Sequence, residues 1–392
     1  MTPSARVQAA IEILDEVIGS SQSDGPPADT LVARYFKTRR YAGSKDRRAV
    51  RELVFRAIRT CGELPVNGRS AMVSVADTDL ALAKLFDGSP HGPEAREKNE
   101  ASVEASLIPA WIQPLLSDHV TSEEWPTLLE RAPVDLRANI ARVGRKELLG
   151  QIEGAKPTSI SPWGLRLPPD TRVDDHPTFQ QGLFEIQDEG SQLIALACQP
   201  KDGEQILDLC AGAGGKSLAI ASAAPGAKIL ASDTNRSRLS QLEPRAERAG
   251  ARIEARLLDG GRESNQLEDM IDGCDIVLVD APCSGSGTWR RNPEGRWRLT
   301  PERLDRLVKL QARLLEIAAP LVRPGGALIF ATCSIIRAEG TDQARNFLGR
   351  HSSWMVQDVG FDGGRPDGPG RLLTPAHDAT DGFFVARFVR SC

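Results

Sequence analysis

The chain of 392 residues is longer than one ordinary hydrophobic core, so we expect two or three domains. Hydrophobic residues make up 40% and charged residues 26% of it, a balance typical of soluble globular proteins. Every apolar run is shorter than the roughly 20 residues that span a membrane, and the N-terminus lacks the features of a signal peptide. We therefore expect a cytoplasmic, monomeric protein without a membrane partner. The formal net charge of -4 gives no indication of nucleic-acid binding by itself.

The first 125 residues are predicted to form a helical domain. Apolar residues recur at helical spacing over residues 7–18, where Gly19 is expected to end the helix, and again over residues 49–58. Residues 87–100 resemble a mobile connection. Residues 126–180 alternate between short strand and helix patterns and are interpreted as a small α+β module.

Basic residues are unevenly distributed. Residues 34–59 contain ten Lys/Arg against two acids, and residues 290–313 contain eight against three, with Trp297 among them and Trp289 directly before them. Basic surface interrupted by aromatic side chains suits phosphate contact combined with base stacking. A solvated helix face is the alternative for each cluster.

From residue 181 to residue 392 the pattern becomes a strand–helix repetition, which favours an α/β domain with a largely parallel sheet. Strands are predicted at residues 206–209, 228–232, 252–257, 276–279 and 327–331. Several end in polar residues: Asp233, Asp259, Asp280 and the pair Thr332-Cys333. Open parallel sheets bind their ligands at this carboxyl edge.

A glycine-rich loop follows the first of these strands. A phosphate-binding P-loop would need glycine where Cys210 stands, and a dinucleotide fingerprint starting at Gly212 would need glycine at Ser217. A glycine turn before a helix N-terminus, with acids on later strands, suits S-adenosylmethionine. We expect its amino-acid end at the loop, its ribose at Asp233 and its adenine near Asp259. The alternative for each acid taken alone is a structural role, as a helix cap or as part of a solvated turn.

The seven cysteines form an odd set without a Cys-x-x-Cys pair, which argues against a disulfide framework and a metal site. Two of them, Cys283 and Cys333, follow strands. Methylation of C5 in a pyrimidine requires a thiolate that adds to C6 and makes C5 nucleophilic, and an acid such as Asp280 that stabilises the adduct. This chemistry alone leaves open which thiol attacks. The other cysteines outside the glycine loop are interpreted as small hydrophobic residues: Cys61, Cys198, Cys274 and Cys392.

The segments VDAPCSGSGT (279–288), FATCSI (330–335) and CAGAGGKS (210–217) resemble the signature elements of the Sun/Fmu (RsmB-type) family of S-adenosylmethionine-dependent RNA cytosine-C5 methyltransferases. Further segments also resemble that family: SLIPAW (106–111), PVDLRAN (133–139), QDEGSQ (187–192) and TDGFF (380–384). The resemblance implies a Rossmann-like class I methyltransferase domain and an RNA substrate, most plainly 16S rRNA. It assigns Cys333 as the nucleophile, Cys283 as the thiol that assists product release and Asp280 as a contact to the cytosine. The cofactor site would be lined by Cys210, Ala211, Gly212, Ala213, Gly214, Gly215, Lys216, Asp233, Asp259 and Asp280.

The chain departs from the family pattern at two places. Gly212-Ala213 replaces the usual Ala-Pro of the loop, and Glu339-Gly340-Thr341 replaces Glu-Asn-Glu after the second cysteine motif. The N-terminal domain resembles a NusB-like RNA-binding extension through its helix content and Lys45-Asp46-Arg47-Arg48, although an unrelated helical domain is the alternative.

Two other functions fit parts of the pattern. Transfer RNA is the alternative substrate, and a non-catalytic ribosome-assembly factor is the alternative of another class. An amino-group methyltransferase would carry Asn/Asp-Pro-Pro-aromatic where this chain has Asp-Ala-Pro-Cys.

Overall fold

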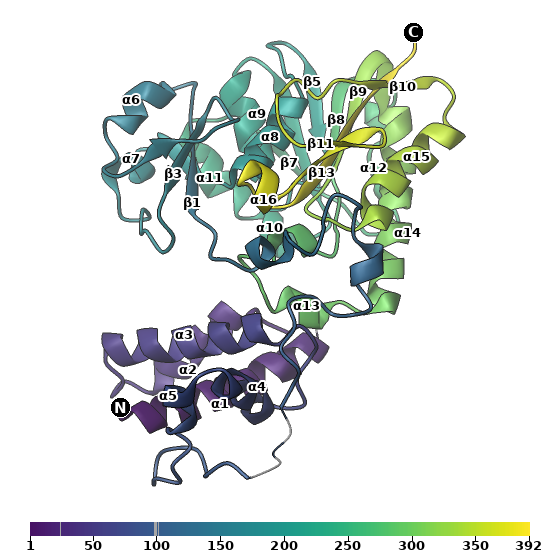
Figure 1. Cartoon of the computed structure of the whole chain (residues 1–392). Coiled ribbons are helices and arrows are strands. Elements are labelled where there is room, and N and C mark those ends of the chain that lie inside the picture. The colour runs from purple at the N-terminus through teal and green to yellow at the C-terminus, as the bar shows by residue number, and fades with distance from the viewer. Residues whose placement is uncertain (24, 98–99, 101) are drawn as a thin grey trace. The chain divides into compact units, whose positions relative to one another are not determined.

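A computed structural model describes residues 1–23, 25–97, 100 and 102–392. Within these residues the chain forms two compact units (Figure 1). The first comprises Met1–Leu116, Thr121–Glu130 and Thr288–Arg303, and the second comprises Ser117–Val120, Arg131–Gly287 and Leu304–Cys392. The sequence-based boundaries at residues 125 and 180 therefore do not coincide with the compact units. Of the expected mobile connection at 87–100, residues 98 and 99 lie outside the described part.

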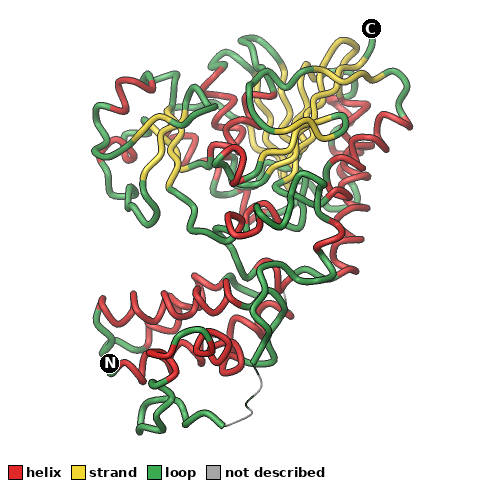
Figure 2. Tube along the Cα trace, viewed as in Figure 1, coloured by secondary structure: helices red, strands yellow, loops and turns green. Residues whose placement is uncertain are grey.

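The first unit is helical in its described residues, as Figure 2 shows by colour. Thr2 caps the first helix by accepting a hydrogen bond from the Ala5 amide, and Pro3 occupies the first turn. The prediction that Gly19 ends this helix was wrong, because the buried face continues through Ser20 and Ser21. The helices are α1 (Pro3–Gln22), α2 (Ala28–Thr38), α3 (Ser44–Thr60), α4 (Gly68–Asp77), α5 (Leu80–Ala83) and α13 (Gly295–Arg298), with the 3-10 turns η1 (Gln113–Leu115) and η2 (Trp125–Leu128).

The core of this unit includes a residue from far along the chain. Trp297 is buried among the apolar faces of α1 to α4, and its indole N–H donates to the Cys61 carbonyl at 2.9 Å. The Arg296 guanidinium donates to the carbonyls of Ile58 and Leu107. These contacts place Thr288–Arg303 with the helices, although it follows the first cysteine motif in sequence.

The second unit contains a small antiparallel sheet with strand order β2-β3-β1-β4. The alternation of short strands and helices expected over residues 126–180 is present, but the fourth strand of the sheet lies beyond residue 180. Its described elements are β1 (Val134–Ala138), β2 (Lys156–Pro157), β3 (Gly164–Leu167), β4 (Phe184–Ile186), α6 (Arg145–Leu149) and α7 (Pro177–Gln180). Leu136, Leu165 and Phe184 form the centre of its own apolar core.

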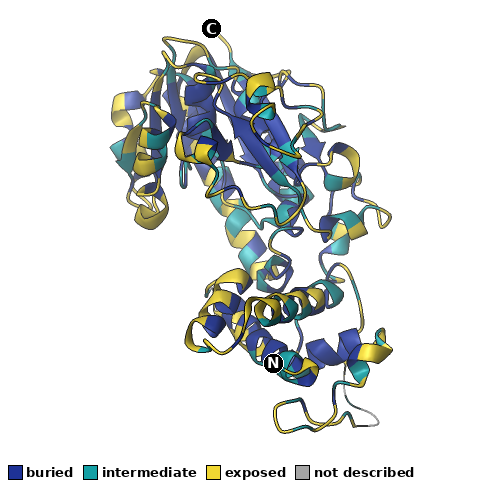
Figure 3. Ribbon diagram, turned by 90° about the vertical axis from the view of Figure 1, so that its left-hand side faces the viewer, coloured by how far each residue is buried: buried dark blue, intermediate teal, exposed yellow. Residues whose placement is uncertain are grey.

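The main sheet has the order β11-β12-β13-β9-β8-β5-β6-β7, and β10 pairs with β13. Strands β5 to β9 are mutually parallel, as predicted, and β10 to β13 add an antiparallel edge. The strands are β5 (Gln205–Asp208), β6 (Lys228–Asp233), β7 (Glu254–Leu257), β8 (Cys274–Asp280), β9 (Val322–Thr332), β10 (Trp354–Gln357), β11 (Arg365–Asp367), β12 (Gly370–Leu373) and β13 (Phe383–Arg390). The central strands β5, β6, β8, β9 and β13 are buried along most of their length, whereas β7, β10 and β11 at the margins are mostly partly buried or exposed (Figure 3).

The chain order reverses at β5, because β6 and β7 lie on one side of it and β8 and β9 on the other. Ligands of open α/β sheets bind at such a switch point, beyond the carboxyl ends of the strands. The helices of this unit are α8 (Glu189–Ala197), α9 (Gly215–Ala223), α10 (Arg236–Leu239), α11 (Leu242–Ala249), α12 (Glu263–Gln266), α14 (Pro301–Ala318), α15 (Thr341–Arg350) and α16 (Pro375–Asp378), with the 3-10 turns η3 (Glu268–Met270), η4 (Ser286–Thr288), η5 (Ala319–Leu321) and η6 (Arg337–Glu339). None of the helices in the described chain is both long and apolar enough to cross a membrane.

Candidate active site at the carboxyl edge of the sheet

Two cysteine thiols meet at the ends of neighbouring strands. In the parallel register of β8 and β9, Asp280 lies opposite Ala331, so the segments that follow leave the sheet side by side. The sulfur atoms of Cys283 and Cys333 are 3.3 Å apart, and both residues are partly exposed. The structure thus brings the two thiols together, which is the arrangement that addition and release at one pyrimidine ring require.

The Cys283 thiol holds its proton strongly. Its hydrogen bond with Cys333, its burial, and the nearby charges of Cys333 and Glu339 all raise its pKa well above the usual value. Whichever thiol ionises first makes the other harder to ionise. Cys283 is therefore suited to stay a thiol and donate a hydrogen bond to the sulfur of Cys333.

A partly buried ion pair lies close to the Cys333 thiol. The Lys216 ammonium, at the start of α9, donates to a carboxylate oxygen of Asp280 at 2.6 Å and lies 5.6 Å from the centre of the Phe383 ring. Burial by itself lowers the pKa of Lys216, but Asp280, the Cys333 thiol and Asp208 outweigh it, so the pKa is raised. The ammonium is therefore a fixed positive charge within electrostatic reach of Cys333.

The glycine loop has the backbone conformation that its sequence suggested. Gly212 and Gly214 have φ angles of 58° and 77°, in the left-handed region that favours glycine. The Gly212 amide donates to a carboxylate oxygen of Asp233 at 2.7 Å, while the other oxygen accepts from the Asn235 amide at 2.7 Å. The departure at Gly212 thus has a structural reason, since its φ of 58° strains a residue that has a Cβ.

Asp208, at the end of β5, is a site residue that the sequence pattern did not single out. One of its oxygens accepts from the Ser217 hydroxyl at 2.6 Å, and the other is buried with no hydrogen-bond partner among the described residues. Burial raises the pKa of Asp208 to about 7, partly offset by Ser217 and Lys216 and reinforced by the charges of Asp280 and Asp233. The feature of the sequence that could have identified Asp208 is its position as the one acid in an apolar strand, two residues before the glycine loop begins at Cys210.

These groups fit a sulfonium cofactor. The carboxyl groups of Asp208, Asp233 and Asp280 outnumber the two cationic side chains near them, Lys216 and Arg238, which suits a ligand that carries a positive sulfur. The free amides at the N-terminus of α9 suit the ligand's carboxylate. No cluster of potential metal ligands is found in the described part of the chain.

Asp259 lies further from this cluster. It follows β7, which is separated from β5 by β6, and it is exposed. Its amide donates to the side-chain oxygen of Gln266 at 2.6 Å, and its carboxylate accepts from the same side chain at 3.3 Å. The structure places it on the same edge of the sheet as Asp233, at the outer strand.

The stacking role considered for Trp289 and Trp297 is contradicted by their burial. Their side chains are 1% and 5% exposed, so neither presents a face to a base. In the same segment Arg290 and Arg296 are also buried. Arg47 and Arg48 on α3, in contrast, are exposed, as RNA contacts would need to be.

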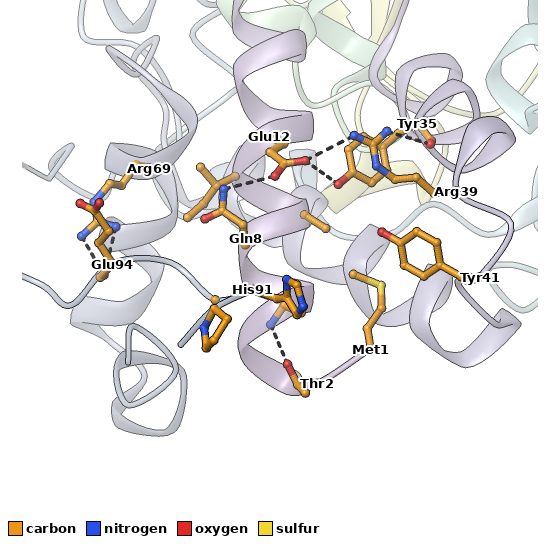
Figure 4. A pocket seen from close by; sticks show the side chains of 15 residues that line it. Met1, Thr2, Gln8, Glu12, Tyr35, Arg39, Tyr41, Arg69, His91 and Glu94 are labelled. Atoms are coloured by element: carbon orange, nitrogen blue, oxygen red, sulfur yellow. Dashed lines mark hydrogen bonds and ion pairs between the residues drawn. The ribbon is translucent and has the colours of Figure 1, made fainter. Parts of the chain in front are cut away.

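The helical unit contains a separate groove of about 1120 Å³, shown in Figure 4. At its centre the Glu12 carboxylate accepts from the Tyr35 hydroxyl at 2.6 Å and pairs with Arg39 at 3.6 Å. The Arg39 guanidinium also lies over the Tyr35 ring. These three side chains therefore satisfy one another's hydrogen bonds and charges within the groove.

The fold and the site together define a Rossmann-like, S-adenosylmethionine-dependent methyltransferase. A family model described as 16S rRNA methyltransferase RsmB/F matches residues 195–389. Ribosomal RNA small subunit methyltransferase B of Pectobacterium atrosepticum is 34% identical over 294 residues, covering 73% of this chain and 67% of the relative. The same-named protein of an Enterobacter species is 33% identical over 292 residues, covering 72% and 67%. The chain thus spans about two thirds of the length of these relatives.

Solved structures share the fold. The crystal structure of a protein called PH0851 covers 100% of this chain and 99% of its own, with a TM-score of 0.76 and 22% identity. NSun6 of Pyrococcus horikoshii, solved with the ligand SFG, covers 72% of this chain and 97% of its own, with a TM-score of 0.64 and 19% identity. The chain belongs to the RsmB/F family of methyltransferases, which confirms the resemblance found in the sequence, and it is an S-adenosylmethionine-dependent RNA methyltransferase.

Proposed function

We propose that this protein methylates C5 of a cytosine in 16S rRNA, with Cys333 as the nucleophile. The observation that carries the proposal is the 3.3 Å separation of the Cys283 and Cys333 sulfur atoms beside the Lys216–Asp280 pair. The names of the curated relatives support small-subunit ribosomal RNA as the substrate. Because a stacked base is out of reach of the sheet edge, the target cytosine must leave its stack to react.

The first step is addition of the Cys333 sulfur to C6 of the cytosine. The thiolate is the reacting form, and the Lys216 ammonium, which lies within electrostatic reach, stabilises it. Asp280 would hydrogen-bond the cytosine ring and hold it in register with Cys333. The new C6–S bond places the electron pair of the former double bond at C5.

The second step forms the C5–methyl bond while the methyl–sulfur bond of the donor would break and leave a neutral thioether. S-adenosylmethionine, when bound, supplies an electrophilic methyl group on a positively charged sulfur. The residues that would hold it are the glycine loop Cys210–Lys216 together with Asp208 and Asp233, with Asp259 nearer the adenine. The excess of carboxyl groups at this edge stabilises the positive charge before transfer.

In the last step a water molecule from solvent accepts the C5 proton, the C5=C6 double bond forms again, and the Cys333 sulfur leaves as a thiolate. The Cys283 thiol, which keeps its proton, can donate a hydrogen bond to that leaving sulfur. Without this hydrogen bond the thiolate is a poorer leaving group, and the covalent adduct should persist. This gives a physical reason for the two cysteines to have different roles.

The test is methyl transfer from labelled S-adenosylmethionine to unmodified 16S rRNA, followed by nucleoside analysis and bisulfite mapping. We expect label in 5-methylcytidine at a discrete position. Unmodified transfer RNA is the parallel substrate. Label in transfer RNA alone would contradict the choice of substrate, and RNA binding without any transfer would favour an assembly factor.

A further inference from the structure

A buried carboxylate connects the two segments that carry the thiols. Glu339 lies at the end of η6, six residues after Cys333, and its side chain is inaccessible to solvent. Burying a carboxylate is costly unless hydrogen bonds satisfy it. The hydrogen-bond partners of Glu339 therefore indicate what its buried carboxylate does in the structure.

The partners come from both cysteine segments. One oxygen of Glu339 accepts from the Ser284 amide at 2.8 Å, and the other accepts from the hydroxyls of Ser284 and of Ser334, the latter at 2.6 Å. Ser284 directly follows Cys283, and Ser334 directly follows Cys333. A single side chain thus fixes the residue next to each thiol.

Neighbouring groups reinforce this connection. Gln311 of α14 donates from one amide nitrogen to Glu339 at 3.0 Å and to the Pro282 carbonyl at 2.9 Å. The Ser286 hydroxyl lies 3.0 Å from that of Ser334 and accepts from the Ile335 amide at 3.0 Å. The carboxylate is therefore the centre of a hydrogen-bonded network that spans both segments.

We propose that Glu339 is a positioning residue, which rests on the proposed function: it holds Cys283 and Cys333 at the separation that addition and release require. The carboxylate contacts neither sulfur, so it acts through the backbone and the two serine hydroxyls. Its negative charge also contributes to the raised pKa of the Cys283 thiol, after the larger effects of Cys333 and burial. Misplacement of reacting groups by about 1 Å costs on the order of 100-fold in rate.

Two variants test this proposal. Glu339→Gln puts an amide group where two hydroxyls need an acceptor, and Ser334→Ala removes the hydroxyl next to Cys333 while leaving the carboxylate in place. We expect kcat for methyl transfer to fall about tenfold or more in both, with KM for S-adenosylmethionine and RNA affinity within about twofold of the original. Ser334→Thr, which keeps the hydroxyl, should restore most of the loss.

A second readout measures the thiols directly, without RNA. Dibromobimane becomes fluorescent when it bridges two nearby thiols, and peptide mapping can locate the bridge at Cys283 and Cys333. Bridging should be efficient in the original protein and reduced in Glu339→Gln and Ser334→Ala. If bridging is unchanged in both variants, or if kcat is unchanged, the proposal is wrong.

Glu189 provides the control. It is also a fully buried carboxylate; it accepts from the Ile160 and Ser161 amides at 2.7 Å each and pairs with Arg166 at 3.4 Å, so these contacts involve neither cysteine segment. Glu189→Gln should keep bridging and kcat per folded molecule, so an equal loss there would overturn the specific role of Glu339. Since bridging needs no RNA, failure of the proposed substrate would leave this test intact.

Discussion

At the scale of single residues, the site is organised by charge. Asp208 and Asp280 lie near the Lys216 ammonium, and the charges of Asp280 and Asp233 oppose ionisation of the Asp208 carboxyl and contribute to its raised pKa. Ionisation of Asp208 is also unfavourable because its carboxyl group is buried and one oxygen has no hydrogen-bond partner among the described residues. A positively charged ligand would stabilise the ionised carboxylate.

Cofactor affinity should consequently depend on pH through Asp208. Its pKa of about 7 means that the carboxyl is mostly protonated at pH 6 and mostly ionised at pH 8. A cationic sulfonium favours the ionised form, so S-adenosylmethionine should bind more tightly as the pH rises, by about tenfold per unit that binding lowers the pKa of Asp208. Calorimetric titration at pH 6 and pH 8 measures this change. Asp208→Asn should flatten it, and an equal pH dependence in the variant would contradict the assignment.

The Asp208 carboxyl also makes the free energy of unfolding depend on pH, in the direction opposite to that of cofactor affinity. The unfolded carboxyl has a pKa near 3.9, so between about pH 4 and pH 7 the folded state binds more protons and the free energy of unfolding falls as the pH rises. Asp208→Asn removes this contribution.

The sequence alone was sufficient to propose the two thiols, the glycine loop and Asp233 as site residues, because each stands in a short local pattern typical of the proposed chemistry. Asp208 and Glu339 were missed for one physical reason. Their functions depend on burial and on hydrogen-bond partners from other elements, such as Ser217 on α9 for Asp208 and Ser284 after β8 for Glu339. Such partners have no fixed spacing in the sequence.

At the scale of elements, the β8–α13 connection is held against the end of the sheet by glycine contacts. Gly287 donates its amide to the Cys333 carbonyl at 3.0 Å and accepts from the Gly382 amide at 2.8 Å. An added Cβ on Gly287 would lie 1.9 Å from the Gly382 carbonyl oxygen, so no larger residue fits without moving the backbone.

Gly287→Ala should therefore lower both the melting temperature and the methyl-transfer rate, since the backbone that must move is bonded to Cys333. Thermal unfolding and initial-rate assays measure the two effects. Gly349 on α15 is the control, because its Cβ would meet nothing within 4 Å; Gly349→Ala should stabilise by about 0.5–1 kcal/mol with unchanged activity. Wild-type behaviour of Gly287→Ala would show that this glycine packing is unimportant.

The parallel strands β5 to β9 were predictable from apolar runs bounded by polar residues. Helix ends and surface roles were less predictable. Trp289 and Trp297 looked like stacking residues because basic residues surround them in the sequence, but tertiary packing buries them. The residue types around a side chain in the sequence do not show whether it is buried or which residues cover it.

At the scale of the whole molecule, RNA affinity is expected to depend on the helical unit. Arg47 and Arg48 are exposed on α3, close to other basic residues. Contacts between such side chains and phosphates release counterions, so binding should weaken as salt rises.

Reversing both charges, Arg47→Glu with Arg48→Glu, should weaken RNA binding and reduce the salt slope by about 1 for each phosphate that the variant no longer binds. Filter binding over a range of salt concentrations measures both quantities. Lys146 and Lys156, exposed in the small module, supply a charge-matched control pair. Equal effects for both pairs would indicate diffuse electrostatic attraction instead of a binding surface on α3.

The proposed mechanism depends most on the division of roles between the two thiols, and covalent trapping tests it directly. Cys283→Ala, incubated with S-adenosylmethionine and its RNA substrate, should accumulate a protein–RNA adduct that survives a denaturing gel, because the Cys333 sulfur adds but leaves slowly. The double variant Cys283→Ala with Cys333→Ala should form none. An adduct in Cys333→Ala instead, or none in Cys283→Ala, would contradict this division of roles.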